Sequence, residues 1–136
     1  MSGPTAEAGL PPRRLITLEA GGEQVPTVQP RLNGAYLAPE GPVPEVGFLV
    51  LHPLSSVLDH PLLAPLAGLG FAALGLNSRF LNNQAAVRVP ALLLDVDAGV
   101  RFLRDAGVRR VILLGHSLGG SLMCLYQSQS EAPGRT

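Results

Sequence analysis

Residues 110–120 read RVILLGHSLGG, and this stretch decides the fold of the chain. An apolar run leads into Gly115-His116-Ser117-Leu118-Gly119, which has the form Gly-x-Ser-x-Gly, and small residues that can begin a helix follow. Such a motif between a strand and a helix is typical of a nucleophilic serine on a sharp turn. Glycines on either side avoid the clashes that a Cβ atom would make with the neighbouring strand and helix. We therefore predict that Ser117 is a nucleophile.

Alternating strands and helices are predicted along the rest of the chain. Residues 14–19 alternate polar and apolar side chains, as an outer strand with one wet face does. Residues 46–51 form a continuous apolar run, which is typical of a parallel strand buried on both faces. We expect further strands over 32–37, 71–76 and 111–114, helices from Asp59 to about Leu69, from about Pro90 to Ala106 and from Leu118 onward, and helix ends at Gly70 and Gly107.

This order of elements predicts an α/β fold with a mostly parallel sheet and flanking helices. We expect residues 1–13 to be a disordered lead-in and residues 14–136 to belong to one domain. Functional groups of parallel sheets gather at the carboxyl ends of the strands. Here those ends are His52-Pro53, Asn77-Ser78 and Gly115-His116-Ser117.

Composition limits the partners and the location. The chain has 136 residues and an apolar fraction of 46%, which is enough for one domain with a hydrophobic core. Ten arginines, with no lysine, balance ten acidic residues, so we expect neither nucleic acid nor an anionic membrane as a partner. Residues 1–10 lack the features of a secretory signal, and residues 61–76 are too short and too broken for a membrane span. A cytoplasmic location is predicted.

The sequence contains no metal-ligand cluster, nucleotide loop or prosthetic-group motif, so we expect no cofactor and no metal. A glycine-rich turn that holds a phosphate would need Gly-x-Gly-x-x-Gly, whereas serine stands at position 117. The single cysteine, Cys124, excludes an internal disulfide, and we expect a buried thiol.

The chain resembles the N-terminal part of the α/β-hydrolase superfamily. The resemblance rests on residues 48–53, 71–77 and 111–120, which are spaced as the third, fourth and fifth strands of that fold. It implies a serine hydrolase that acts on a small ester or amide through an acyl-enzyme, with Ser117 as the catalytic nucleophile.

The resemblance also implies an oxyanion hole. One donor is the backbone amide of the residue after the serine, Leu118, and the other comes from the loop after the strand over 46–51. Because proline has no N–H, Pro53 cannot donate, and Leu54 is the leading candidate with Ser55 second. We expect the site to be shaped by His52, Ser55, Gly115, His116 and Gly119.

Other polar residues have plainer interpretations. We expect His52 to shape the oxyanion loop rather than act as a base, and His116 to point away from the Ser117 hydroxyl. The aspartates of the helix over 90–106 are expected to form solvated pairs: Asp95, Asp97 and Asp105. For the polar loop after the strand over 71–76, substrate contact and plain solvation both stay open; its residues are Asn77, Ser78, Arg79, Asn82 and Asn83.

Catalytic partners for Ser117 do not follow it in this sequence. The residues after Ser117 include one acid, Glu131, and no histidine, whereas in α/β-hydrolases the acid and the histidine both follow the serine. We therefore expect a fragment that is nearly inactive alone, with the strand over 111–114 at an open sheet edge. Two alternatives stay open: a catalytically silent binding or structural module, and a cofactor-independent acyltransferase on the same scaffold.

Overall fold

The computed structural model describes residues 10–22 and 29–130, so most of the predicted lead-in lies outside the described residues. The elements are β1 (Arg14–Glu19), β2 (Arg31–Leu37), β3 (Val46–Val50), α1 (Leu63–Gly68), β4 (Ala72–Leu76), the short 3-10 helix η2 (Gln84–Ala86), α2 (Val89–Ala106), β5 (Arg110–Leu114) and α3 (Leu118–Ser130). Within these ranges no helix combines the length and the apolar character that crossing a bilayer requires.

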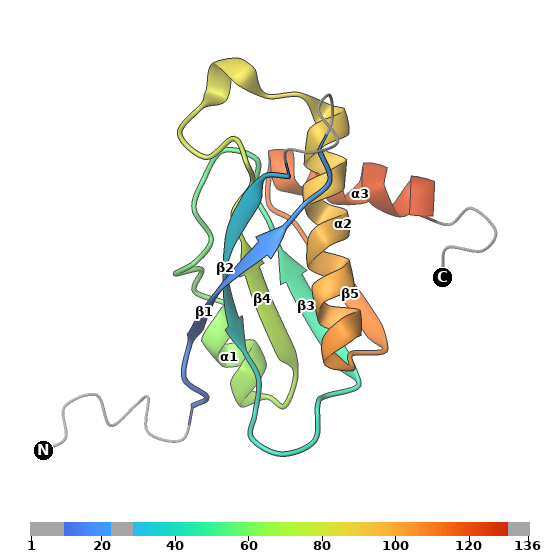
Figure 1. Ribbon diagram of the computed structural model, residues 1–136. Coiled ribbons are helices and arrows are strands. Elements are labelled where there is room, and N and C mark those ends of the chain that lie inside the picture. The colour runs from blue at the N-terminus through green and yellow to red at the C-terminus, as the bar shows by residue number, and fades with distance from the viewer. Residues whose placement is uncertain (1–9, 23–28, 131–136) are drawn as a thin grey trace, which may run out of the picture.

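β3 lies between β4 and β5 in a five-stranded sheet whose strand order is β1-β2-β4-β3-β5. It pairs in parallel with β4 on one side and β5 on the other, while β2 runs antiparallel to β1 and to β4. The chain passes from β3 through α1 to β4, then through α2 back across β3 to β5. Such a reversal leaves a crevice at the carboxyl ends of the strands. In Figure 1 those ends point upward, toward the β4–α2 loop and the start of α3. The predicted α/β sheet is confirmed.

Helices cover both faces of the sheet, with α2 and α3 on one face and α1 on the other (Figure 1). β3 and β4 serve both layers, because successive side chains of a strand point to opposite sides. Leu49 and Leu74 pack with Val96 in the α2 layer, whereas their neighbours Val50 and Ala73 pack in the α1 layer. The continuous apolar runs of β3 and β4 are explained by this double burial.

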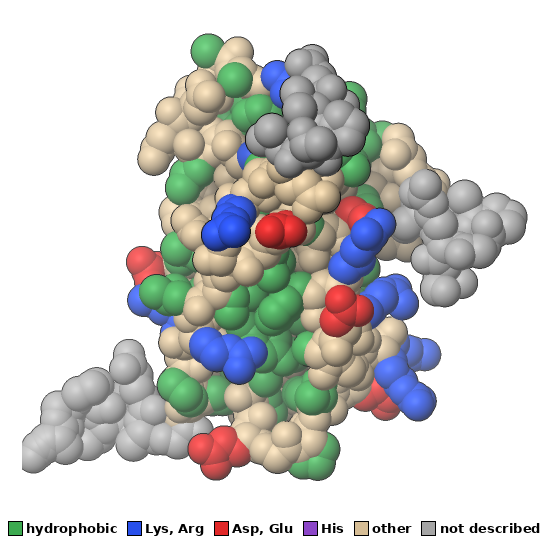
Figure 2. All heavy atoms as spheres, viewed as in Figure 1, with side chains coloured by type: hydrophobic (Ala, Val, Ile, Leu, Met, Phe, Trp, Pro, Cys, Tyr) green, Lys and Arg blue, Asp and Glu red, His purple; other side chains and the backbone are tan. Residues whose placement is uncertain are grey.

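The antiparallel strands also support α2. The ring of Tyr36 in β2 packs edge-on against Phe102 of α2, with ring centroids 5.3 Å apart. Ile16 and Leu18 of β1 are half-buried against the same core. Figure 2 shows hydrophobic side chains filling the strip between the N-terminal strands and α2, with charged side chains on either side of it.

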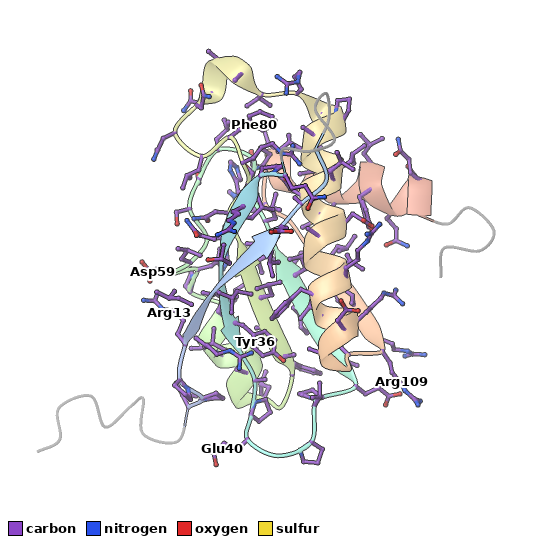
Figure 3. All side chains as sticks on the ribbon, in the orientation of Figure 1. Arg13, Tyr36, Glu40, Asp59, Phe80 and Arg109 are labelled. Atoms are coloured by element: carbon purple, nitrogen blue, oxygen red, sulfur yellow. The ribbon has the colours of Figure 1, made fainter. Side chains whose placement is uncertain are left out.

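The first helix is shorter than predicted. Asp59 does not cap it; the carboxylate pairs instead with Arg13, and Figure 3 shows the two side chains pointing toward one another. The chain turns before α1 begins, and His60 Nδ1 accepts the N–H of Leu62 at 3.2 Å. The predicted end is confirmed, because Gly70 has a φ of +100°, in the left-handed region that favours glycine.

Two burial predictions were wrong. Asp95 is fully buried, because its place on α2 is one turn from the buried Ala91 and Gly99, on the helix face that packs on the sheet. Cys124 is exposed, because it lies over the outer side of β5, which is an edge strand in the described part of the chain. α2 itself ends as predicted, at Gly107 with a φ of +113°.

A pH-dependent contact joins α2 to α3. The Tyr126 hydroxyl donates a hydrogen bond to Asp97 Oδ1 at 2.9 Å, and burial together with this bond raises the pKa of Tyr126 to about 12. Below pH ~10 the tyrosine is protonated in both the folded and the unfolded chain, so its contribution to stability is complete. Between pH ~10 and ~12 mainly the unfolded chain ionises, and the folded state loses stability.

We expect urea titrations to show a loss on the order of 1–2 kcal/mol in the free energy of unfolding over that range, and a smaller loss in Tyr126→Phe. The control is Tyr36→Phe, because burial raises the pKa of Tyr36 as well, against the opposing charge of Arg14. An unchanged loss in Tyr126→Phe would contradict the assignment.

Candidate active site

Ser117 occupies a strained turn between β5 and α3. Its φ is +57°, a left-handed conformation that residues other than glycine rarely adopt and that costs on the order of 1–3 kcal/mol. Gly119 N–H donates to His116 O at 2.9 Å, and Gly120 N–H donates to Ser117 O at 3.0 Å, so the chain reverses within one turn. Ser117 is exposed to solvent. The strand, sharp turn and helix predicted around Ser117 are all present.

The neighbouring glycines are required by close backbone contacts. A Cβ atom on Gly115 would lie 2.3 Å from the carbonyl carbon of Gly119, and one on Gly119 would lie 2.7 Å from the carbonyl oxygen of Leu51. The turn therefore presses against the first turn of α3 and against the end of β3. The predicted reason for glycine at these two positions is confirmed.

The loop after β3 faces this turn and is organised by His52. The imidazole Nδ1 accepts two backbone N–H groups, those of Leu54 and Ser55, both at 3.1 Å. Since Nδ1 is an acceptor, the neutral ring carries its hydrogen on Nε2. The Leu54 amide thus points at His52 in this structure, and it can serve an oxyanion only by exchanging that hydrogen bond for one to the substrate. The Leu118 amide stands in the first turn of α3, where amides lack intrahelical partners.

Asn77 and Ser78 hold the same loop from the neighbouring strand, β4. Asn77 Oδ1 accepts the N–H of Val57 at 2.8 Å, and its Nδ2 donates to Ser56 Oγ at 3.2 Å. Ser78 Oγ donates to Pro53 O at 2.7 Å. Both side chains are buried, so neither substrate contact nor plain solvation describes them. Their position directly after β4, the neighbour of β3, is the signal that points to this role.

Arg79 and Asp95 form a buried ion pair beneath the β4–α2 loop. Arg79 Nη2 and Nε lie 2.8 and 2.9 Å from Asp95 Oδ1, and the Arg79 backbone N–H donates to Oδ2 at 2.9 Å. Arg79 Nη2 also donates to Gly21 O at 2.8 Å. Burial raises the pKa of Asp95, and the hydrogen bonds and charge of Arg79 oppose that rise.

Of the predicted loop, Asn82 and Asn83 are exposed. Phe80, at the top of Figure 3, is buried in the core of the molecule.

The other two aspartates of α2 lie nearer the surface. Asp97 pairs with Arg101 one turn along the helix, at 2.7 Å, and Asp105 is exposed. The predicted solvated positions of Asp97 and Asp105 hold, and Asp97 also accepts the hydrogen bond from Tyr126.

A cavity lined by histidines and serines together with Val50, Leu51 and Val57 opens beside Ser117, and we call it the polar cavity for its imidazoles and hydroxyls. Its volume is about 310 Å³, and Ser117 and the three histidines of the chain line it: His52, His60 and His116. Ser55, also predicted to shape the site, lines it too. Sequence reasoning missed His60, which is brought in by the turn before α1. In the described residues no group of three potential ligand side chains is arranged to hold a metal ion.

A second cavity of about 310 Å³ lies on the other side of the same turn, and we call it the apolar groove. Leu54 and Leu118, the two predicted oxyanion residues, belong to its wall. The remaining apolar side chains come from α2, α3 and the segment before α2: Val87, Val89, Leu92, Leu122 and Leu125. The segments 52–54 and 117–118 thus form a ridge between a polar cavity and an apolar one.

The solved structures most similar to this chain include esterases. Esterase Est22 superposes with a TM-score of 0.69 over 95% of this chain, at 19% sequence identity, and the chain spans 41% of its length. This chain has the α/β-hydrolase fold. A bacterial heroin esterase superposes with a TM-score of 0.66 over 90% of this chain, at 22% sequence identity, and the chain spans 41% of its length. The esterase of Pyrobaculum calidifontis superposes with a TM-score of 0.68 over 97% of this chain, at 19% identity, and the chain spans 44% of its length.

The similarity is one of fold. No protein-family model and no curated protein sequence matches the chain. The chain spans about two fifths of the length of these three esterases. Within the α/β-hydrolase fold, β3 and β5 carry the two loops that meet at this turn, so the site is assembled from neighbouring strands.

Proposed function

We propose that this chain carries the nucleophile of a serine hydrolase that cleaves an ester or amide through an acyl-enzyme. The observation that supports it is the φ of +57° at Ser117, between two glycines whose positions admit no side chain. Backbone strain of this kind persists where the surrounding structure enforces it, and it clusters at active sites. The strained residue here is an exposed serine at the carboxyl ends of the parallel strands β3, β4 and β5, where substrates bind in such folds.

The chemistry assigns one role to each group. A base takes the proton of Ser117 Oγ as the oxygen attacks the substrate carbonyl carbon, and the carbonyl electrons move to the oxygen. The Leu118 N–H, with Leu54 after its exchange from His52, donates to that oxyanion. The intermediate collapses, the leaving alkoxide or amine takes the proton, and water then hydrolyses the acyl-enzyme. In α/β-hydrolases the acid and the histidine base both follow the serine in the sequence, and this proposal assigns the base the same order relative to Ser117.

Labelling with a fluorophosphonate probe tests this function. Three proteins are compared: the 136-residue chain, its Ser117→Ala variant, and the chain extended through any downstream reading frame. We expect the extended form to label at Ser117 and the shorter chain to label at least about 100-fold more slowly, since a positioned base contributes roughly 10²–10⁴-fold. Peptide mapping identifies the modified residue.

Two other results have definite meanings. If neither form labels although circular dichroism shows both to be folded, the nucleophile assignment fails and a catalytically silent module is the better description. If the 136-residue chain labels as fast as the extended form, a base within the chain activates Ser117, and the histidines of the polar cavity become the candidates.

A further inference from the structure

β1 is an edge strand, and one side of its backbone has no partner strand among the described residues. The sheet order places β2 beside β1 on one side only (Figure 1). Ala20 N–H donates to Pro30 O at 2.9 Å, which continues the β1–β2 ladder by one pair. Because backbone groups alternate in direction along a strand, the even-numbered residues of β1 bond to β2 and the odd-numbered residues point away from it. The free groups therefore belong to Leu15, Thr17 and Glu19.

This free edge is open to solvent. All three odd-numbered residues of β1 are exposed, and Leu15 is 64% exposed. Outside the β1–β2 ladder, no hydrogen bond of the described residues uses their backbone N–H or C=O groups. Edge strands are commonly protected against pairing by proline or by a bulge. β1 pairs with β2 without a break over residues 14–19 and contains no proline, so its free edge can accept another strand.

The charges at the two ends of this edge identify the partner as a second copy of the same strand. Arg13 directly precedes β1, and Glu19 is its last residue. The period of two puts both on the strand face that carries Leu15 and Thr17. Two copies that pair antiparallel about Ile16 place Arg13 of one copy opposite Glu19 of the other, at both ends of the pair. Opposite charges on facing strands stabilise such a pair.

The neighbouring registers lose this match. Two-fold symmetry pairs the central residue with its own copy, so each register is defined by its centre. Centring on Leu15 places Glu19 opposite Pro11, which has no N–H to donate. Centring on Thr17 places the carboxylate of Glu19 opposite the apolar side chain of Leu15. The pairing about Ile16 is therefore the register that the side chains favour.

The other face of the pair is apolar at its centre. In the register about Ile16, the two Ile16 side chains lie opposite each other, and Leu18 lies opposite Arg14. Ile16 and Leu18 are only half-buried against the core of the single chain. The Arg14 guanidinium carbon lies 5.2 Å from the centre of the Tyr36 ring, so the aliphatic part of Arg14 is held along the sheet. Pairing would thus cover apolar surface that one copy leaves partly exposed.

We infer that β1 is an interaction surface for a second copy of this chain, with which it forms an antiparallel pair centred on Ile16. The two sheets are thereby joined into one. This inference does not depend on the proposed hydrolase function. A contact of this size is at the low end for specific complexes, so we expect a dissociation constant of about 10 µM to 1 mM. Sedimentation equilibrium over that concentration range measures the balance of monomer and dimer, and a chain that stays monomeric throughout would overturn the inference.

Proline at position 17 tests the backbone pairing. Thr17→Pro removes an N–H that points to the free edge, and the hydrogen bonds to β2 are kept. We expect this variant to stay monomeric up to about 1 mM, and Thr17→Val, which keeps the N–H and the β-branched shape, to dimerise like the parent. Circular dichroism checks that both variants fold. A folded Thr17→Pro protein that dimerises like the parent would assign the association to another surface, such as the edge at β5, and would reject the inference.

Charge reversal tests the register without proline. Glu19→Arg places two arginines opposite each other at both ends of the pair. Arg13 also pairs with Asp59, so its reversal is made as Arg13→Glu/Asp59→Arg, which keeps opposite charges at those two positions. We expect each variant alone to dimerise about fivefold more weakly or worse, and an equimolar mixture of the two to recover the affinity, because all its cross-strand charges are complementary. A mixture no tighter than the separate variants would contradict the register.

Disulfide trapping locates the centre of the pair. In a Cys124→Ser background, Ile16→Cys places two thiols opposite each other, at a pair where the Cα atoms of antiparallel strands lie about 4.5 Å apart. Leu18→Cys is the matched control, because residue 18 lies on the same face and stands opposite Arg14 instead. We expect mild oxidation to link Ile16→Cys at least about tenfold faster than Leu18→Cys, since a disulfide needs Cα atoms within about 7 Å. Equal rates for the two variants would refute a pair centred on Ile16.

Discussion

Replacing Gly115 with alanine is expected to destabilise the fold by about 3 kcal/mol or more, the upper end for overpacked sites. The added Cβ would meet the backbone of Gly119 at 2.3 Å and Gly120 N at 2.5 Å. Backbone atoms cannot rotate away as a flexible side chain can. The turn over residues 115–119, which we call the elbow, must therefore open, and α3 must shift. Urea denaturation followed by circular dichroism measures the loss, and the same variant should no longer react with the fluorophosphonate probe in the extended chain.

Two neighbouring glycines provide the matched comparison. Gly119→Ala should be nearly as damaging, because its Cβ would lie 2.7 Å from Leu51 O. Gly120→Ala should change stability by less than about 1 kcal/mol, since its closest contact is 3.3 Å, to Gly115 O, and alanine favours the helix by a similar amount. A Gly115→Ala protein as stable as Gly120→Ala would contradict the tight elbow.

Replacing Asp95 with alanine is expected to cost about 3–5 kcal/mol, because the change leaves the guanidinium of Arg79 buried without its partner. The Asp95 side chain is fully buried and that of Arg79 is 11% exposed. The loss also releases the Arg79 backbone amide, which holds the start of the β4–α2 loop. Denaturant titrations at neutral pH measure the change in the free energy of unfolding.

The control is Asp97→Ala on the same helix, which removes a partly exposed ion pair with Arg101 and the Tyr126 contact and should cost about 1–2 kcal/mol, less than Asp95→Ala. The double variant Arg79→Leu/Asp95→Leu should be more stable than Asp95→Ala, because it leaves no unpaired buried charge. A double variant no more stable than Asp95→Ala would show that the unpaired charge of Arg79 is not the source of the loss.

The parts of the molecule that follow from local chemistry were predictable from the sequence. The Ser117 turn is one, because the requirement for glycine at 115 and 119 arises from neighbours a few residues away or on the adjacent strand. The parallel strands β3, β4 and β5 are another, because continuous apolar runs indicate burial on both faces. The ends of α1 and α2 at Gly70 and Gly107 follow from the left-handed backbone there.

Three features that the sequence did not predict, at Asp59, Asp95 and Leu54, have a different cause, which is pairing between distant residues. Asp59 reads as a helix cap until Arg13, far away in the sequence, takes its carboxylate. Asp95 reads as a surface residue until Arg79 neutralises it inside the protein. The direction of the Leu54 amide depends on the conformation of a whole loop, with His52 at its start and Asn77 and Ser78 holding it from β4. Partners of this kind are set by the tertiary fold and leave no periodic signal.

The position of β3 has a consequence for how the site responds to thermal motion. β3 is hydrogen-bonded on both sides, and the elbow rests on its last carbonyl groups through Gly119. Local opening begins at edges and chain ends, whereas doubly paired central strands exchange their amides last. The turn at Ser117 follows β5, an edge strand in the described residues, so the close approach of Gly119 to the end of the doubly paired β3 is the contact that steadies the serine backbone. In the proposed reaction the substrate carbonyl would meet the Leu118 amide on a backbone that is already fixed, so little reorganisation would oppose the reaction there.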